Sequence, residues 1–460
     1  MAEVKHYIVK NGTIIDVEMG DSFHGSIEIE GTKITRIYKS GESFPKTIPT
    51  IDAIGMYIIP GLIDMHCHIQ SRFAPHFLAS GVTTVRNPAS NVLMIEDLLE
   101  APLDGPTPRV FSADRMIDGE PGLWGPTSFG NFVTEDAEEA RQEVRRQVAA
   151  GVHFIKIYGL ANREVIQATV EEARKFELEV ACDLIHSQKV SALEAAELGV
   201  TWFEHASGFV QTLYPGWYPS ADQAEWSHIS WEEPDEKRIK ELCEQMLRYK
   251  VKLCPTLVLI DQANQHPDFW YPKNVVTQSL EEHDILMSHW HSMAEQVDGI
   301  KQQLCNQHAF TKTVAKTYFE LGGTVVPGTD TPALIYTFPG MALHRELELF
   351  NEIGMTEMET LQAATIHAAR SINLVDIGAI KEGYIADLVL LNENPLEAIE
   401  HTKEIHRIIK GGKMYSQEEI LKCIPTKEKL EKQMVEFEKR WETEMEQVKM
   451  NDGVASIKDS

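Results

Sequence analysis

Eight short apolar runs, rich in β-branched residues, alternate with stretches of helical spacing along the middle of this 460-residue chain. The runs cover residues 59–68, 81–86, 109–112, 152–158, 178–186, 200–205, 251–259 and 323–330. Repeated strand–helix units favour a parallel sheet, because each helix returns the chain to the start of the next strand. Eight units predict a (β/α)8 TIM barrel, longer than the typical ~250 residues but within the range that insertions allow.

Both ends of the chain carry a different pattern, in which short alternating segments are separated by glycines. This pattern is typical of antiparallel strands joined by turns, and it occupies residues 5–53 and returns from residue 386 onward. We therefore predict an α/β protein with a small β-sandwich domain built from both chain ends, residues 1–58 plus 375–418. The barrel domain would span residues 59–374.

Three segments fall outside these two patterns. Residues 206–250 and 260–310 are insertions that contain clusters of aromatic residues, and they fit a lid, an interface or simple packing over the barrel. Residues 419–460 form a charged helical tail. Its apolar stripe at helical spacing predicts that it docks on its own chain or on a partner subunit. The stripe consists of Leu430, Met434, Phe437, Trp441 and Val448.

Composition narrows the class of partner. A formal net charge of −27 argues against nucleic acid and against an anionic membrane surface. The first residues lack the apolar core of a signal peptide, no run approaches membrane-spanning length, and the six cysteines include no Cys-x-x-Cys pair. The sequence thus predicts a cytoplasmic protein with reduced thiols and a small-molecule substrate.

His66 and His68 end the first apolar run. Side chains two apart on a strand point to the same face, so the two imidazoles are expected side by side, which suits a metal ion. A chain with 18 histidines contains such a pair by chance, and His289 and His291 are one. Their surroundings have helical spacing, which predicts residues on a helix surface. His66 and His68 therefore need support from other strands.

Ligand-type residues also lie at or near the ends of four further runs: Lys156, His186, His205 and Asp330. The C-terminal ends of barrel strands meet at one face, where barrel enzymes have their active sites, so we expect these side chains in one pocket. Each alone has a structural alternative, such as a buried histidine or an aspartate cap. Together they favour a metal site, and four histidines with one aspartate exceed the needs of one tetrahedral ion.

Lys156 fits a site with two ions only in a modified form, because an ammonium group cannot coordinate a cation. Reaction of its amine with CO2 would give a carbamate, a bridging carboxylate, and burial near metal charge disfavours the ammonium form. Tyr158 lies two residues on and points the same way, so it is expected to reach a substrate carbonyl or carboxylate. Arg86, near the end of the second run, fits either a substrate carboxylate or a structural ion pair.

At this point the sequence resembles the amidohydrolase superfamily, in particular its prolidase-like and imidazolonepropionase-like branch. The resemblance covers about residues 5–415. The matching segments are 60–68, 156–159, 204–205, 254–257, 328–330, 363–365, 378–383 and 386–389. The family implies a metal-binding barrel beside a β-sandwich, and it leads us to expect a homo-oligomer.

The resemblance implies a site with two divalent ions, zinc or alternatively manganese, bridged by carboxylated Lys156 and a hydroxide. The ligands implied for the first ion are His66, His68 and Asp330. The ligands implied for the second ion are His186 and His205. The hydroxide would attack the carbonyl carbon of an amide or peptide bond, and Asp330 would pass its proton to the leaving amine. Tyr158 would help to hold the substrate oxygen. The predicted substrate is a dipeptide, an Xaa-Pro-like dipeptide or an N-acyl amino acid.

Two departures and three alternatives stay open. Asn87 stands where relatives often carry Asp, and the loop 119–126 lacks the His-Gly segment of some dipeptidases, so a substrate carboxylate is recognised differently or is absent. The same metals would also serve a cyclic amidase, an imidazolone hydrolase or a lactonase. A mononuclear deaminase is disfavoured, because His186 does not begin a His-x-x-Glu motif. A non-catalytic scaffold of this fold is disfavoured, because all six candidate ligands are present.

Overall fold

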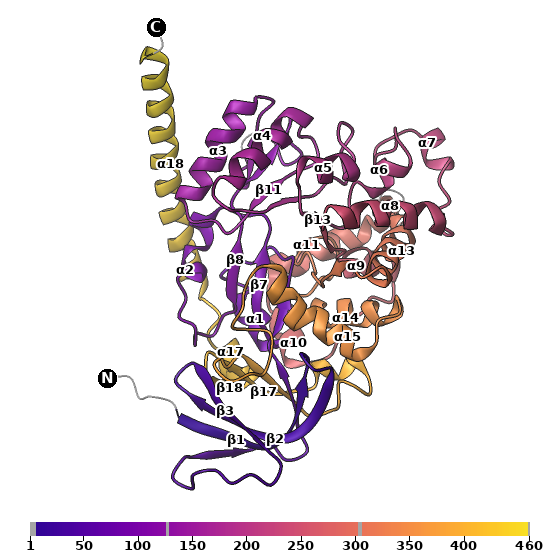
Figure 1. Ribbon diagram of the computed structural model, residues 1–460. Coiled ribbons are helices and arrows are strands. Elements are labelled where there is room, and N and C mark those ends of the chain that lie inside the picture. The colour runs from indigo at the N-terminus through magenta and orange to yellow at the C-terminus, as the bar shows by residue number, and fades with distance from the viewer. Residues whose placement is uncertain (1–5, 126–127, 302–305, 459–460) are drawn as a thin grey trace.

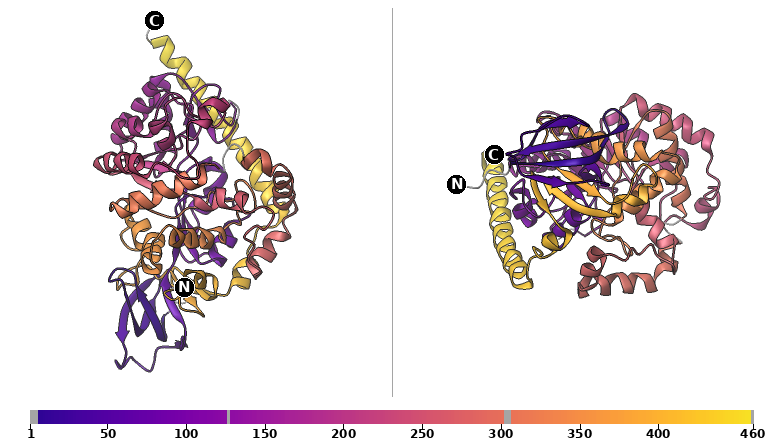
Figure 2. Two further views of the ribbon diagram at one scale, coloured as in Figure 1. Left: turned by 90° about the vertical axis from the view of Figure 1, so that its right-hand side faces the viewer. Right: turned by 90° about the horizontal axis from the view of Figure 1, so that it is seen from below.

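The computed structural model describes residues 6–125, 128–301 and 306–458. Strands from the two ends of the chain lie together at the lower end of the molecule in Figure 1, and the strand–helix units of the middle region form the body above them. The C-terminal helix α18 (Lys427–Lys458) runs along one side of the body and extends past it (Figures 1 and 2).

The two terminal β regions join in a single eight-stranded sheet, as the sequence predicts. Strand β5 is the junction, because it pairs in parallel with β1 from the N-terminal region and antiparallel with β16 from the C-terminal region. The folding of this sheet into a two-layered sandwich stays a prediction. Its strands are β1 (His6–Asp16), β2 (Asp21–Glu30), β3 (Lys33–Lys39), β4 (Thr50–Asp52), β5 (Tyr57–Pro60), β16 (Leu388–Leu391), β17 (Ile405–Lys410) and β18 (Lys413–Tyr415).

The strands of the middle region are parallel, which confirms the predicted α/β class. They form a three-stranded sheet, β6-β7-β8, and a seven-stranded sheet, β10-β9-β11-β12-β13-β14-β15. The run 59–68 overlaps both β5 and β6, each of the other seven runs overlaps one strand, and β9 and β10 were not predicted. The bounds are β6 (Leu62–Asp64), β7 (Val82–Asn87), β8 (Arg109–Ser112), β9 (Met116–Asp118), β10 (Asn131–Val133), β11 (Ile155–Ile157), β12 (Val180–Cys182), β13 (Trp202–Glu204), β14 (Lys252–Cys254) and β15 (Thr324–Val325).

Backbone hydrogen bonds connect both edges of the three-stranded sheet with the seven-stranded sheet. Beyond β6, the amide of Met65 donates to the carbonyl of Pro327 (2.9 Å), and Cys67 forms a parallel bridge with Thr331. At the other edge, the amide of His153 donates to the carbonyl of Ser112 (2.9 Å). Inward-facing residues from both sheets also pack in one buried cluster. These contacts are consistent with the predicted barrel.

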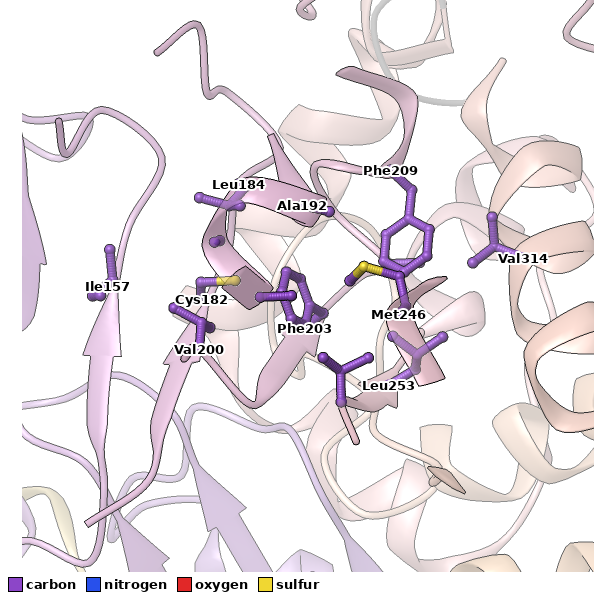
Figure 3. Close-up of a cluster of buried hydrophobic side chains, with 14 of the residues drawn as sticks. Ile157, Cys182, Leu184, Ala192, Val200, Phe203, Phe209, Met246, Leu253 and Val314 are labelled. Carbon is purple, nitrogen blue, oxygen red and sulfur yellow. The ribbon is translucent and has the colours of Figure 1, made fainter. Parts of the chain in front are cut away.

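The strands place apolar residues on one face and site residues on the other. Figure 3 shows Ile157, Cys182, Phe203 and Leu253, each from a different strand, in a cluster that also contains helix residues such as Met246. The helices are α1 (Ala74–Ala79), α2 (Glu96–Leu99), α3 (Ala137–Ala149), α4 (Arg163–Arg174), α5 (Ala192–Leu198), α6 (Phe209–Leu213), α7 (Gln223–Ser227), α8 (Glu236–Arg248), α9 (Leu257–Asn264), α10 (Val275–Glu281), α11 (Asp284–Glu295), α12 (Val297–Ile300), α13 (Gln307–Glu320), α14 (Ala342–Glu352), α15 (Glu357–Gln362), α16 (Ala368–Ser371) and α17 (Gln417–Leu421).

The aromatic insertions pack against the body. Trp217 and Trp226 are buried, and their ring centroids lie 5.2 Å apart, so simple packing accounts for the first insertion. In the second insertion, His289 and His291 are exposed on α11, which confirms that this pair lies on a helix surface. Within the described ranges, no helix is both long enough and apolar enough to cross a lipid bilayer.

Helix α18 docks on its own chain, the first of the two predicted alternatives. Phe437 is buried, and its ring centroid lies 5.2 Å from that of Phe129. Arg440 pairs with Glu96 at 2.8 Å, at the start of α2. Val448, the last residue of the predicted apolar stripe, lies outside the residues whose side chains are described.

Gly328 allows the segment after β15 to approach His66. A Cβ atom at this position would lie 2.4 Å from Cys254 Sγ and 2.7 Å from His66 Cβ. We therefore expect Gly328→Ala to lower the free energy of unfolding by about 1–3 kcal/mol, the usual cost of overpacking. Urea-induced unfolding measures this effect. Gly299→Ala in α12 is the control, because a Cβ there meets no atom within 4 Å. Equal stabilities of the two variants would contradict the close approach.

Candidate metal centre

Six of the eight predicted site residues line one cavity of about 450 Å³. These six are His66, His68, Lys156, Tyr158, His205 and Asp330. They come from strand β11 or from the segments that follow strands β6, β11, β13 and β15. Arg86 and His186 are not among the lining residues. The ends of distant strands thus meet as the sequence predicts, with two exceptions.

Lys156 faces the cavity because it lies between two outward-facing residues of β11. Ile155 and Ile157 pack in the outer apolar cluster, so the alternation of the strand directs the lysine inward. Its side chain is buried, and its Nζ has no hydrogen-bond partner among the described residues. The nearest carboxylate oxygen is Glu204 Oε1, at 3.9 Å. A buried amine without a partner is costly unless another group satisfies it.

Three cavity histidines use Nδ1 for a bond that leaves Nε2 facing a carboxylate. His66 Nδ1 lies 2.8 Å from Glu204 Oε2, and His68 Nδ1 lies 3.1 Å from the carbonyl oxygen of Ala89. His205 Nδ1 lies 2.5 Å from Thr256 Oγ1.

These acceptors fix the tautomer of each ring. A carbonyl and an ionised carboxylate only accept, and the Thr256 hydroxyl already donates to the carbonyl of Pro255 (2.8 Å). Each Nδ1 therefore carries a proton, and each Nε2 is the ring nitrogen that faces the cavity. This is the arrangement in which histidine binds a metal ion.

Asp330 lies beside two of these Nε2 atoms. Its Oδ1 lies 3.2 Å from His66 Nε2 and 2.9 Å from His68 Nε2. Burial would raise the pKa of Asp330, but the two histidines hold it well below its usual range. Burial lowers the pKa of His66, whereas Glu204 and Asp330 raise it, with a net value of about 9. His66 thus faces two anions, whose charge either a proton or a metal cation can neutralise.

His205 and Asp330 both have left-handed backbone conformations, with φ values of 59° and 57°. Such conformations are uncommon for residues other than glycine, and each costs on the order of 1–3 kcal/mol. At His205 the turn lets two consecutive residues serve the site: Glu204 contacts His66, and His205 lines the cavity. Strain of this kind concentrates at functional sites.

Asp183, and not the predicted His186, lines the cavity at the end of β12. Strand β12 ends at Cys182, so Asp183 continues the inward face of Ala181, and its buried carboxylate lines the cavity. Its Oδ2 lies 3.5 Å from His205 Nε2. His186 lies three residues farther along, after the strand has ended. The prediction extended the strand to residue 186, whereas its alternation indicates Asp183.

Arg86 forms the structural ion pair, the second of its two predicted alternatives. Its side chain is fully buried, with the guanidinium carbon 4.1 Å from the ring centroid of Phe154 and 4.3 Å from that of Trp202. It donates to Glu204 Oε1 at 2.7 Å and to the carbonyl of Met65 at 3.2 Å. Burial would raise the pKa of Glu204, but Arg86, Lys156 and His66 hold it well below its usual range. Arg86 thereby keeps the partner of His66 ionised.

Tyr158 lies on the cavity wall beside these groups. Burial and the nearby carboxylates of Asp183 and Asp330 raise the pKa of its hydroxyl well above the usual value. The phenol therefore stays protonated and can donate a hydrogen bond into the cavity.

The residues fit divalent cations. Ligand atoms of His66, His205 and Asp330 lie within 4.8 Å of one another. Imidazole nitrogens and carboxylate oxygens are ligands of zinc, and manganese also accepts carboxylates. A second group, His66, Glu204 and Cys254, is less suited, because Arg86 already pairs with Glu204 and burial raises the pKa of the Cys254 thiol well above its usual value.

Removal of Arg86 should leave a buried, unpaired carboxylate. We expect Arg86→Met to lower the free energy of unfolding by about 3–5 kcal/mol, the usual cost of breaking a buried ion pair. Chemical denaturation measures the loss. Since Glu204→Gln removes the orphaned charge, the double variant should recover much of that stability. If the double variant loses as much stability as the two single variants lose together, that result would contradict the ion pair.

The family model described as Amidohydrolase family matches residues 57–415. Adenine deaminase from Listeria monocytogenes is 38% identical over 113 residues, 21% of this chain and 19% of that protein. Ochratoxinase from Aspergillus niger is 25% identical over 330 residues, 67% of this chain and 55% of that protein. The chain thus matches about a fifth and about half of the length of these two relatives.

A solved structure of a putative prolidase from Bifidobacterium longum is similar in fold. Its TM-score is 0.66 at 21% sequence identity, and the match covers 92% of this chain and 99% of that one. The family model covers most of the chain, including both parallel sheets and the whole candidate metal centre. The resemblance noted in the sequence is therefore confirmed: the chain belongs to the amidohydrolase family.

Proposed function

We propose that this protein hydrolyses a carbon–nitrogen amide or peptide bond of a small substrate with the help of two divalent metal ions. One observation carries the proposal. Three histidines from two strand ends have their Nδ1 atoms engaged, and their Nε2 atoms face the carboxylates of Asp330 and Asp183. Such a convergence of imidazole and carboxylate suits a cation better than it suits a purely structural cluster.

We also infer that the two parallel sheets close into the predicted (β/α)8 barrel. The hydrogen bonds from Met65 to Pro327 and from His153 to Ser112 support this inference, because they connect both edges of the three-stranded sheet with the seven-stranded sheet. Closure would place the cavity at the C-terminal ends of the strands, the usual position of an active site in this architecture.

The ligand assignment differs from the sequence-based one at a single position. His66, His68 and Asp330 would hold one ion. His205 and Asp183 would hold the other, with Asp183 in the role first given to His186. Lys156, whose buried Nζ has no hydrogen-bond partner in the part of the chain that the structure describes, would carry the CO2-derived carbamate and serve as a further ligand. With Asp183 in place of His186, the second position has a carboxylate instead of an imidazole. A carboxylate is a harder ligand, in the sense of hard and soft acids and bases, than an imidazole. The revised ligand set therefore favours manganese more than a set with four histidines would.

When bound, the ions would polarise the scissile carbonyl and supply hydroxide at neutral pH. The residues of the chain have complementary tasks. Asp330, ionised in the folded protein, can accept the proton of the attacking water and return it to the leaving amine. Tyr158, which stays protonated, can donate a hydrogen bond to the substrate oxygen.

The names of similar proteins support an amide substrate. The Aspergillus niger relative is an ochratoxinase, and the Bifidobacterium longum neighbour is a putative prolidase. The cavity, at about 450 Å³, fits a dipeptide or an N-acyl amino acid rather than a polymer. A lactonase or cyclic amidase would use the same residues and is the alternative. A non-catalytic scaffold would have no need of strained ligand residues.

A substrate panel tests the reaction. Zinc- or manganese-loaded protein should hydrolyse members of a set of dipeptides and N-acyl amino acids, and Asp330→Asn should lower kcat by about 10²–10⁴-fold, the range for loss of a general acid–base. Steady-state kinetics gives both values. Hydrolysis of lactones alone would favour the alternative, and no hydrolysis together with no bound metal would favour the scaffold.

Metal content tests the revised ligand. We expect Asp183→Ala to lose about one metal equivalent per chain, because it removes a ligand from the second position. His186→Ala, three residues away and outside the cavity, is the matched control and should keep both equivalents. Plasma emission spectrometry after dialysis gives the stoichiometry. A loss of metal from His186→Ala and not from Asp183→Ala would restore the original assignment.

A further inference from the structure

Helix α18 forms one wall of a second, outer chamber of about 250 Å³. Leu430, Met434 and Phe437, one turn or two apart on the same face of the helix, line this chamber. The apolar wall continues on the body of the protein with Met94 and Ile95. The outer chamber is therefore mainly apolar on two opposite sides.

The outer chamber adjoins the candidate metal centre. The two cavities share five lining residues: His68, Gln70, Ala89, Ser90 and Gly130. A substrate whose amide bond lies at the metal centre can therefore extend one of its ends into the outer chamber. Since the family model ends at residue 415, the α18 wall lies outside the matched region.

A short chain of hydrogen bonds fixes α18 against the loop that follows His68. Gln433 Nε2 donates to Asp97 Oδ2 (2.9 Å), and Ser71 Oγ donates to the other oxygen of the same carboxylate (2.9 Å). Asp97 thus joins the helix to residue 71, three positions after a metal-ligand candidate. These hydrogen bonds fix the position of the α18 wall of the chamber relative to the candidate metal centre.

Arg72 supplies a positive charge to the outer chamber. It is half-buried and lines the chamber beside Ser71. No carboxylate of the described residues lies within ion-pair distance of its guanidinium group, whose only recorded contact is the ring of Phe73, at 5.8 Å. Both oxygens of the neighbouring Asp97 already accept other bonds. An arginine so placed suits a carboxylate, which it can bind through two parallel hydrogen bonds.

We propose that the outer chamber binds the amine-side product of the reaction, an amino acid with an apolar side chain. Its carboxylate would pair with Arg72, and its side chain would pack against Leu430, Met434 and Phe437. The assignment of this ligand to the leaving group rests on the proposed function. The preference of the chamber for a ligand with a carboxylate and an apolar side chain does not rest on the proposed function.

A binding experiment with a product, L-phenylalanine, separates the two proposals. L-phenylalanine has no amide bond to cleave, so its binding does not require the proposed reaction. Saturation-transfer NMR titrations with the metal-loaded protein would compare L-phenylalanine with 2-phenylethylamine, which lacks the carboxylate, and with glycine, which lacks the ring. Arg72→Gln should weaken the binding of L-phenylalanine about tenfold or more and leave that of 2-phenylethylamine unchanged, as expected for loss of a charge-assisted pair. Met434→Gln should weaken both aromatic ligands and leave glycine unchanged.

Two matched variants serve as controls. Arg163→Gln removes an exposed arginine from α4, and Val435→Gln places the same glutamine on an exposed position of α18 next to Met434. Both should bind L-phenylalanine as the unaltered protein does. No binding of L-phenylalanine, or equal binding by Arg72→Gln and Arg163→Gln, would overturn the inference. Arg72-dependent binding without hydrolysis of N-acetyl-L-phenylalanine would keep it and remove the proposed function.

Discussion

The buried carboxylate of Glu204 links three strands and orients the metal centre. One oxygen accepts from Arg86 on β7, and the other lies 2.8 Å from His66 Nδ1 beyond β6. A buried charge without a partner is strongly destabilising, so the guanidinium makes the carboxylate tolerable at this depth. The ionised carboxylate in turn fixes the tautomer of His66 and so determines which nitrogen faces the cavity.

The same logic extends to the rest of the site. His68 and His205 direct Nε2 into the cavity because neighbouring acceptors bind their Nδ1 atoms, and these acceptors are a backbone carbonyl and a hydroxyl. The left-handed backbones at His205 and Asp330 store strain that the surrounding packing must compensate. The cost is reasonable at a position whose function depends on an exact meeting of ligands, whereas a purely structural core would avoid it. Helix α18 then adds, outside the family region, a wall that the metal centre alone would lack.

The alternation of apolar and polar residues and the repeated strand–helix units made much of the fold predictable from the sequence. Eight apolar runs gave eight parallel strands, and the glycine-punctuated ends gave one shared sheet. The single run 59–68 was the exception, since it divides at Gly61, where a Cβ would lie 2.1 Å from Thr83 Oγ1. Local pattern could not show that β5 and β6 belong to different sheets, because both halves of the run are equally apolar.

The site was predictable where a residue's place on its strand decided its direction. Lys156 follows the inward face of β11, and His68 follows that of its run. His186 does not line the cavity because β12 ends at Cys182, four residues before the predicted end, and the alternation of the shorter strand directs Asp183 inward. The role of Arg86 depended on Glu204, 118 positions away in sequence, and no local pattern reports such a contact.

The central claim is that side chains from distant strands meet around divalent cations in one cavity. Anomalous diffraction from crystals grown with excess zinc or manganese, recorded on both sides of the metal absorption edge, tests it most directly. The account predicts two anomalous peaks, one against Nε2 of His66 and His68 and one against Nε2 of His205 and the carboxylate of Asp183. A cavity without anomalous density in metal-replete crystals, or a peak bound by His186 instead, would contradict it.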